Sequence, residues 1–257
     1  YIAVISTGGT GGHIFPACGL LEILKNLDYK VELVSDKRGL TYLDGNFSKA
    51  NIKIISTGTI FQKNPLKLIL SSFLIFFAIL KSIFYLRLIK PKVVFGMGGY
   101  SSFPICLASW ILKIPLIIYE NNLVIGKANK FLLPLAQKIF LSNLETKGIK
   151  EKYQNKVVYT GNILRKDVLN YKHTEQQDLN LLKILVLGGS QAAKVFGEKL
   201  PHIFKKCVDN NLKLFILQQS TSSQIDDIKK YYEDNKINFE LFTFRSNIKN
   251  IFKDVNL

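Results

Sequence analysis

Three glycine-rich turns, each placed directly after a short apolar run, constrain the fold of this chain more than any other feature. They are VISTGGTGGH at residues 4–13, VVFGMGGYSS at residues 93–102 and LVLGGSQAA at residues 185–193. A helical pattern follows each of them, so each turn predicts a strand that ends in glycines and opens a helix. Repeated units of strand, turn and helix are typical of α/β folds with parallel sheets.

The same turns suggest a class of ligand. Glycine allows a backbone to approach an anion closely, and the N–H groups at a helix start supply partial positive charge. One such turn after a parallel strand is often only a tight connection that binds nothing. Three of them at the carboxyl ends of strands, where open α/β sheets bind ligands, favour a ligand that carries phosphates.

Alternating apolar and helical patterns predict two α/β domains, which we place at residues 1–162 and 163–257. A more polar segment, 147–178, contains the turn YTGN and marks the change of domain. Strands are expected at 2–6, 30–35, 52–56, 93–96, 116–119 and 138–142, and helices at 16–26, 65–89, 103–112 and 127–136. In the second domain we expect strands at 183–187, 213–218 and 239–244, and helices at 195–210, 225–232 and 248–252.

Length and cysteine content are consistent with this division. A chain of 257 residues that is 47% hydrophobic is long enough for two cores. Cys18, Cys106 and Cys207 show no metal-ligand spacing, which favours a reduced, cytoplasmic compartment. The chain begins without Met, and residues 255–257 resemble the start of another strand. We therefore expect residues to be missing before Tyr1 and the second domain to be truncated at its C-terminal end.

Positive charge is concentrated in the first part of the chain. Residues 1–164 hold 20 Lys and Arg against 8 Asp and Glu, a net of +12, whereas residues 165–257 hold 15 against 11, a net of +4. No acidic residue occurs between Asp44 and Glu120. Such a basic field predicts a partner that is nucleic acid, anionic lipid or a phosphorylated substrate.

The acid-free stretch contains an apolar helix, PLKLILSSFLIFFAILKSIFYLRLIK, at residues 65–90. Its longest uncharged run, 68–80, is 13 residues, short of the roughly 20 needed to cross a bilayer, so we do not expect it to span one. Two interpretations stay open: a deeply buried core helix, or a helix that packs one face on the sheet and dips another into an anionic membrane surface. Nucleic acid is disfavoured because the basic residues alternate with aliphatic ones and Phe. The expected membrane contacts are Lys67, Phe76, Phe77, Lys81 and Arg87, with Lys90 and Lys92 also at the rim.

Five motifs, in order along the chain, resemble those of the MurG family. They are GGTGGHIFPA, GMGGYSSFP, YENNLVIGKANK, TGNILRKDV and GGSQAA. This family comprises the bacterial UDP-N-acetylglucosamine:undecaprenyl-pyrophosphoryl-MurNAc-pentapeptide N-acetylglucosaminyltransferases. Three positions depart from the family pattern: Tyr119 and Asn121 in the HEQN-like motif, and Ala192 where the third loop usually has a glycine.

The resemblance implies a GT-B fold, in which two Rossmann-like doubly wound domains face a cleft. The first domain would hold the acceptor and face the membrane, and the second would bind the UDP-sugar. The implied reaction is inverting transfer of N-acetylglucosamine from UDP-GlcNAc to the C4 hydroxyl of the MurNAc of lipid I, which forms lipid II in peptidoglycan synthesis. The implied location is peripheral, on the cytoplasmic face of the inner membrane, without a cofactor.

Sugar transfer from a nucleotide diphosphate needs a base for the incoming hydroxyl and stabilisation of the leaving diphosphate. His13 is the histidine beside a glycine turn and is the first candidate base; a local bond at the helix start is the alternative. Glu120 would orient a sugar hydroxyl or make a capping or core hydrogen bond. No Asp-x-Asp pair occurs, so no metal is expected. The expected UDP-GlcNAc-binding residues are Thr10, Gly11, Gly12, Asn122, Arg165 and Ser190, and those on the acceptor and pyrophosphate side are Gly98, Gly99, Tyr100 and Glu120.

Two other classes of function stay open on the sequence. A dinucleotide-dependent oxidoreductase would use Asp36, at the end of the second strand, to bind a ribose. Against it, Ile14 and Ser101 occupy the positions of the third glycine in G-x-G-x-x-G. The other class is a non-catalytic fragment that binds a nucleotide or a membrane surface.

Overall fold

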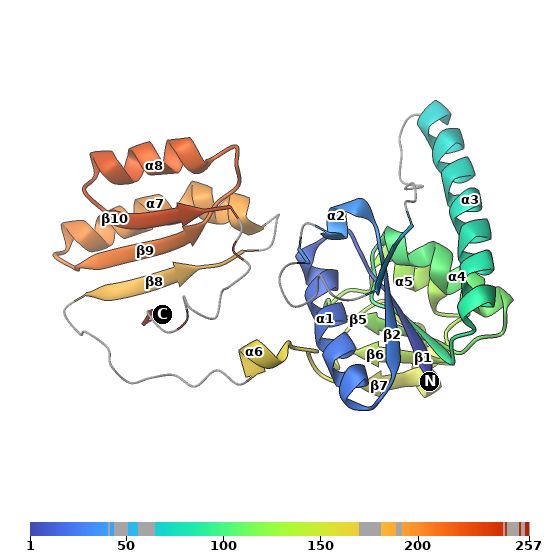
Figure 1. Ribbon diagram of the computed structural model, residues 1–257. Coiled ribbons are helices and arrows are strands. Elements are labelled where there is room, and N and C mark those ends of the chain that lie inside the picture. The colour runs from blue at the N-terminus through green and yellow to red at the C-terminus, as the bar shows by residue number, and fades with distance from the viewer. Residues whose placement is uncertain are drawn as a thin grey trace. The chain divides into compact units, whose positions relative to one another are not determined.

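The computed structural model describes residues 1–40, 42–43, 51–55, 65–169, 181–188, 192–243, 245, 252 and 255–256. The chain divides into two compact units, Tyr1–Leu169 and Asn170–Leu257, each an α/β unit with a parallel sheet (Figure 1). The division falls after Leu169, further along than residue 162, because the connecting segment packs on the first unit. Ile163, for example, joins a core cluster of that unit.

The first unit contains seven parallel strands in the order β3-β2-β1-β4-β5-β6-β7. Winding reverses between β1 and β4, so the glycine turns after these two strands are neighbours at the carboxyl edge of the sheet. The strands are β1 Ile2–Ser6, β2 Lys30–Ser35, β3 Asn51–Ile54, β4 Val93–Gly96, β5 Leu116–Glu120, β6 Lys138–Leu141 and β7 Val157–Tyr159. The expectation lacked β7, which has three residues and is largely exposed.

Helices cover both faces of this sheet. Side chains alternate along β1, so that Ala3 and Ile5 pack against α1 while Val4 joins the core with α3, α4 and α5. The helices are α1 Gly11–Asn26, α2 Lys37–Leu40, α3 Pro65–Ile89, α4 Phe103–Ile111, α5 Lys127–Leu132 and α6 Lys166–Leu169, with 3-10 turns at Tyr100–Ser102 and Glu151–Lys156. The expectation that α1 starts at Pro16 is wrong, because the helix begins at Gly11 and contains that proline.

Helix α3 packs on α4, and it extends beyond the sheet (Figure 1). Ser71, Ala78, Ser82 and Leu86 are buried, and the Ser82 hydroxyl donates to the Ala78 carbonyl at 2.7 Å, which satisfies it within the helix. Large apolar side chains point outward, so the interpretation as a deeply buried core helix is wrong. They are Ile69, Leu70, Phe73, Leu74, Phe76, Phe77, Leu80, Phe84 and Leu88.

The stretch Ile69–Ile89 of α3 is, among the described residues, the one helix long and apolar enough to cross a membrane. This criterion uses length and composition only, and core helices of soluble proteins also meet it.

The second unit has a three-stranded parallel sheet in the order β10-β9-β8 within its described residues. Ile216, Ile228 and Tyr232 form its core with neighbouring apolar side chains. Asn256 lies beside the edge strand β8: its N–H donates to the Lys183 carbonyl at 2.8 Å, and its Oδ1 accepts from the Lys183 N–H at 2.7 Å. The elements are β8 Leu182–Val186, α7 Ala192–Asp209, β9 Leu214–Gln219, α8 Ile225–Asp234 and β10 Asn238–Phe242. Most of the helix expected at 248–252 lies outside the described residues.

Candidate functional site

The turns after β1 and β4 contact each other at the carboxyl edge of the first sheet. Gly98 and Gly99 have φ of +92° and +77°, a region that favours glycine. A Cβ on Gly99 would lie 3.0 Å from the Gly8 carbonyl oxygen. A Cβ on Gly98 would lie 2.9 Å from both Cε1 and Nδ1 of His13. The two glycines therefore make room for the first turn and for the His13 ring.

His13 is the third residue of α1, and its half-buried imidazole lies against the second glycine turn. Its Nδ1 is buried and makes no well-formed hydrogen bond with the described residues. Burial lowers the pKa of His13 below its ordinary value, and the charge of Glu120 and the Met97 backbone oppose this shift only in part. The ring is therefore neutral at pH 7 and able to accept a proton.

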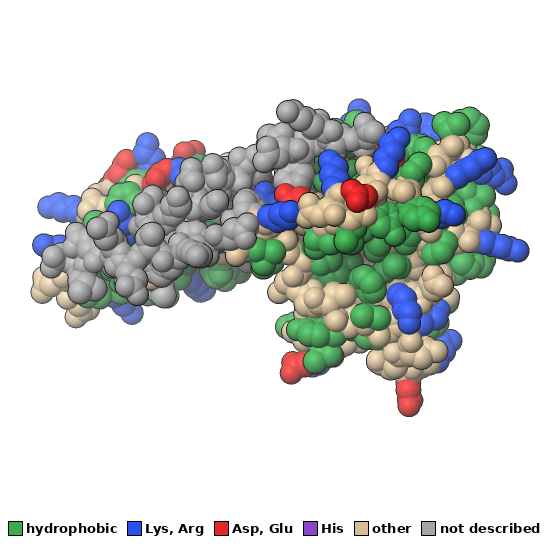
Figure 2. All heavy atoms as spheres, turned by 60° about the horizontal axis from the view of Figure 1, so that its bottom comes forward, with side chains coloured by type: hydrophobic (Ala, Val, Ile, Leu, Met, Phe, Trp, Pro, Cys, Tyr) green, Lys and Arg blue, Asp and Glu red, His purple; other side chains and the backbone are tan. Residues whose placement is uncertain are grey.

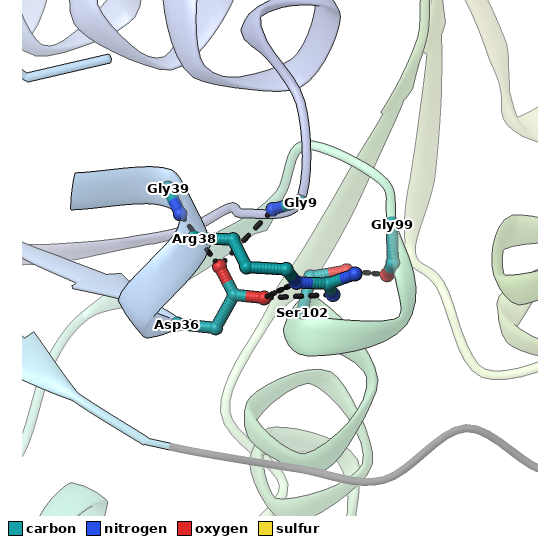
Figure 3. Close-up of polar contacts among 6 residues, drawn as sticks. All are labelled: Gly9, Asp36, Arg38, Gly39, Gly99 and Ser102. Carbon is teal, nitrogen blue, oxygen red and sulfur yellow. Dashed lines mark hydrogen bonds and ion pairs between the residues drawn. The ribbon is translucent and has the colours of Figure 1, made fainter. Parts of the chain in front are cut away.

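Asp36 joins the first glycine turn to the end of β2 (Figure 3). Its Oδ1 accepts from the N–H of Gly9 at 3.1 Å and of Gly39 at 2.9 Å, and its Oδ2 accepts from Nε and Nη2 of Arg38 at 2.9 and 2.8 Å. Burial would raise the pKa of this carboxyl, but the hydrogen bonds from Gly39, Arg38 and Gly9 and the Arg38 charge lower it overall. The acid that a dinucleotide-binding interpretation requires is thus engaged within the protein.

The close-up also shows how the second turn is closed. The Ser102 hydroxyl donates to the Gly99 carbonyl at 2.9 Å (Figure 3). Tyr100 begins the 3-10 turn that follows and is half-buried.

The start of α1 carries two glycines, Gly11 and Gly12, next to the exposed Thr10. Its first turn contains no acidic residue, and the Thr10 side chain does not cap it. Pro16 has no N–H to donate to the Gly12 carbonyl, and the Asn121 side chain donates to that oxygen instead, at 2.7 Å. The helix therefore stays regular at its start, and its first backbone N–H groups carry the partial positive charge that could bind an anion.

Glu120, which is 1% exposed, organises the loop after β5. Its Oε1 accepts from the backbone N–H and side-chain amide of Asn122 at 3.0 and 2.7 Å. Its Oε2 accepts from the Gly126 N–H at 2.8 Å and the Asn129 amide at 3.0 Å. In this geometry Glu120 makes core hydrogen bonds, which is one of its two expected roles. The same bonds engage the side-chain amide nitrogen of Asn122.

The remaining expected site residues are spread over the chain. Arg165 stacks over the Phe15 ring of α1, with Cζ 5.0 Å from the ring centroid. Phe76, Phe77, Lys81 and Arg87 are exposed on α3. Ser190 and the side chain of Lys67 lie outside the described residues.

Two contacts that shape the site are not predicted by any local sequence pattern. The contact of Asn121 with Gly12 joins residues 109 apart. The sequence predicts Asp36 only as a possible ribose ligand, although its position at the end of the strand next to β1 places it beside the first turn. That neighbouring position is the signal by which its role as a turn anchor could have been found.

Known proteins resemble the whole length of the chain. Residues 3–141 match the glycosyltransferase family 28 N-terminal domain and residues 183–257 match the glycosyltransferase family 28 C-terminal domain. A UDP-N-acetylglucosamine–N-acetylmuramyl-(pentapeptide) pyrophosphoryl-undecaprenol N-acetylglucosamine transferase of Pelagibacter ubique is 37% identical over 254 residues, which are 99% of this chain and 70% of the relative. The enzyme of the same name from Rickettsia bellii is 35% identical over 264 residues, covering 99% of this chain and 71% of that one.

Solved structures support the same fold. MurG of Acinetobacter baumannii has a TM-score of 0.67 at 24% identity, with 99% of this chain and 71% of that chain covered. The UDP-GlcNAc 2-epimerase of Neisseria meningitidis, bound to UDP-GlcNAc, has a TM-score of 0.62 at 18% identity, with 99% and 76% covered. These similarities confirm the predicted GT-B fold class. Together with the domain matches and sequence identities, they show that the chain belongs to glycosyltransferase family 28, among the UDP-N-acetylglucosamine–N-acetylmuramyl-(pentapeptide) pyrophosphoryl-undecaprenol N-acetylglucosamine transferases.

Proposed function

We propose that this chain transfers N-acetylglucosamine from UDP-N-acetylglucosamine to the C4 hydroxyl of the MurNAc of lipid I, with inversion. The observation that carries the proposal is the position of the His13 ring, held against Gly98 and Gly99 at the start of α1; burial lowers its pKa, which keeps it able to accept a proton. The acceptor hydroxyl oxygen attacks C1 of the donor sugar while the bond from C1 to the phosphate oxygen breaks. UDP leaves with the electron pair, and the hydroxyl proton passes to Nε2 of His13, since Nδ1 is buried.

The same proposal assigns the diphosphates to backbone amides and cations. The amides at Gly11 and Gly12, with Arg165, bind the donor diphosphate. The role of Ser190 in donor binding stays a prediction from the sequence. The turn at Gly98, Gly99 and Tyr100 faces the acceptor. Glu120 acts by holding the loop after β5 in place, because both of its carboxylate oxygens accept hydrogen bonds within the protein, including those from the backbone N–H and side-chain amide nitrogen of Asn122.

Replacement of His13 tests this mechanism. His13→Ala in the complete protein should lower kcat by about 10²- to 10⁴-fold with little change in donor KM, because a base acts in the transition state. The acidic limb of the kcat/KM profile should lie below pH 6.5, since the pKa of His13 is lowered. A loss smaller than about tenfold would show that His13 is not the base.

We also propose that the exposed face of α3 binds the anionic cytoplasmic surface of the inner membrane. Phe76 and Phe77 are 55% and 56% exposed, and their ring centroids lie 5.8 Å apart. Lys81 and Arg87 are exposed on the same helix. Exposed apolar side chains beside basic ones are typical of peripheral attachment. Figure 2, which turns the bottom of Figure 1 forward and so does not face α3, shows that lysine and arginine side chains also outnumber acidic ones on that face of the first unit.

Vesicle binding measures this attachment. Burial of the exposed half of one Phe contributes about 1 kcal/mol, and repulsion of a new carboxylate by anionic lipid adds about 1 kcal/mol. Phe77→Asp should therefore weaken co-sedimentation with anionic vesicles by about 30-fold, and Lys81→Glu should weaken it in a salt-dependent manner. Leu212→Asp, on an exposed residue of the second unit, is the matched control. Equal binding of all variants would exclude α3 from the membrane contact.

A further inference from the structure

Residues 161–166, which follow strand β7, lie along helix α1. Gly19, in the middle of α1, makes this approach possible: a Cβ there would lie 2.7 Å from the Leu164 carbonyl oxygen and 3.1 Å from the Ile163 side chain. The nearest obstacle is backbone, which cannot swing away as a flexible side chain could. Glycine is a poor helix former, so its place inside α1 is explained by this contact.

The buried Tyr119 holds the same segment from the sheet side. Its hydroxyl accepts from the Ile163 N–H at 3.2 Å and donates to the Gly161 carbonyl at 3.4 Å. Tyr119 is 3% exposed, and burial raises the pKa of its hydroxyl, which stays protonated at physiological pH. One side chain thus bridges both ends of a three-residue stretch, in which Gly161 has a φ of +71°.

Beyond this bridge the segment is attached at two more points of α1. The Lys166 N–H donates to Glu22 Oε2 at 3.0 Å, and the Arg165 guanidinium stacks on Phe15. Phe15, Gly19 and Glu22 are spaced by four and three residues and so share one face of the helix. Arg165 is therefore fixed near the start of α1 by contacts on both of its sides.

We infer that Tyr119 and Gly19 are positioning residues that set the place of Arg165 for binding the diphosphate of a nucleoside diphosphate sugar. The inference rests on the proposed function, which assigns Arg165 to that diphosphate. Neither residue touches the ligand in this scheme. Tyr119 acts by its hydroxyl, and Gly19 acts by the absence of a side chain.

The experiment combines hydrogen exchange with donor binding in the complete protein. Tyr119→Phe keeps the buried ring and removes one hydroxyl, so amide exchange in residues 161–166 should accelerate by about two- to tenfold, and the Kd for UDP-N-acetylglucosamine should rise by a similar factor. Gly19→Ala should produce the larger change in both, although alanine is the better helix former. Tyr153→Phe, on a partly buried tyrosine of the other core cluster, should change neither.

A double-mutant cycle separates positioning from general stability. In an Arg165→Ala background, Tyr119→Phe should have no further effect on the donor Kd, because the residue it positions is gone. Equal factors in both backgrounds, or unchanged exchange in residues 161–166, would overturn the inference. If Arg165→Ala alone leaves the Kd unchanged, the donor role of Arg165 fails and the inference fails with it, whereas the exchange rates still show whether Tyr119 holds the segment.

Discussion

Substitution of Gly98 by alanine should couple energetically to His13. Alanine at a φ of +92° costs about 1–2 kcal/mol wherever it occurs, because its Cβ crowds the backbone. A second cost arises because the new Cβ would lie 2.9 Å from two ring atoms of His13, and such overpacking costs about 1–3 kcal/mol. His13→Ala removes the ring, so only the first cost should remain in the double variant.

Urea unfolding of the wild type, both single variants and the double variant measures this coupling. Trp110 is the only tryptophan of the chain and lies in α4, so its fluorescence reports on the first unit. At pH 7.5, where His13 is neutral, we expect an interaction free energy of about 1–3 kcal/mol.

A matched control uses another glycine with left-handed backbone. Gly148 has a φ of +93°, and a Cβ there would lie 2.8 Å from the Ile125 side chain. Gly148→Ala should therefore destabilise the unit to a similar extent but show no coupling to His13→Ala. Additive effects of Gly98→Ala and His13→Ala would refute the packing of the imidazole on the second turn, and with it the geometric basis of the proposed base.

Two further predictions concern buried carboxylates. Asp36→Asn should lower the free energy of unfolding at neutral pH. Because the pKa of Asp36 is lowered in the folded state, the difference in unfolding free energy between wild type and variant should be constant above about pH 5 and shrink as the pH falls below about 4. A difference that does not vary with pH would contradict this. Glu120→Gln should lower the free energy of unfolding by about 2–4 kcal/mol, since the amide of Gln cannot accept hydrogen bonds from all four N–H groups. It should also lower the pKa of His13 further, as measured by an NMR titration, because the negative charge that raises it is removed. An unchanged or higher pKa would show that the charge of Glu120 does not act on the ring.

Local sequence patterns predicted most elements of the first unit. The runs 2–6, 30–35 and 65–89 have the bounds expected from their apolar residues and the turns that flank them. Strand β7 was not predicted because its apolar run, Val157–Tyr159, is only three residues long. Proline is typical of the first turn of a helix, which predicts a start at Pro16, whereas α1 begins one turn earlier at Gly11.

The candidate site was predictable only in part. Its glycine turns and His13 are adjacent in sequence to recognisable strands, so they could be identified from the order of residues. The supporting contacts join distant residues, as when Asn121 satisfies the carbonyl that Pro16 leaves unpaired. No local sequence pattern specifies such a pair, because it depends on which parallel strands are neighbours in the sheet.

If α3 binds the membrane as proposed, this helix separates the requirements of folding from those of attachment. Its packed side includes Ser71, Ala78, Ser82 and Leu86, together with the partly buried Ile83, Tyr85 and Ile89, so the outward phenylalanines contribute little to the stability of the unit. Those aromatic positions are therefore free to vary in number and size without loss of the fold. Replacing several of them by polar residues should give a protein that folds normally and is easier to keep in solution, while membrane affinity is tuned over a wide range by substitutions on one helix.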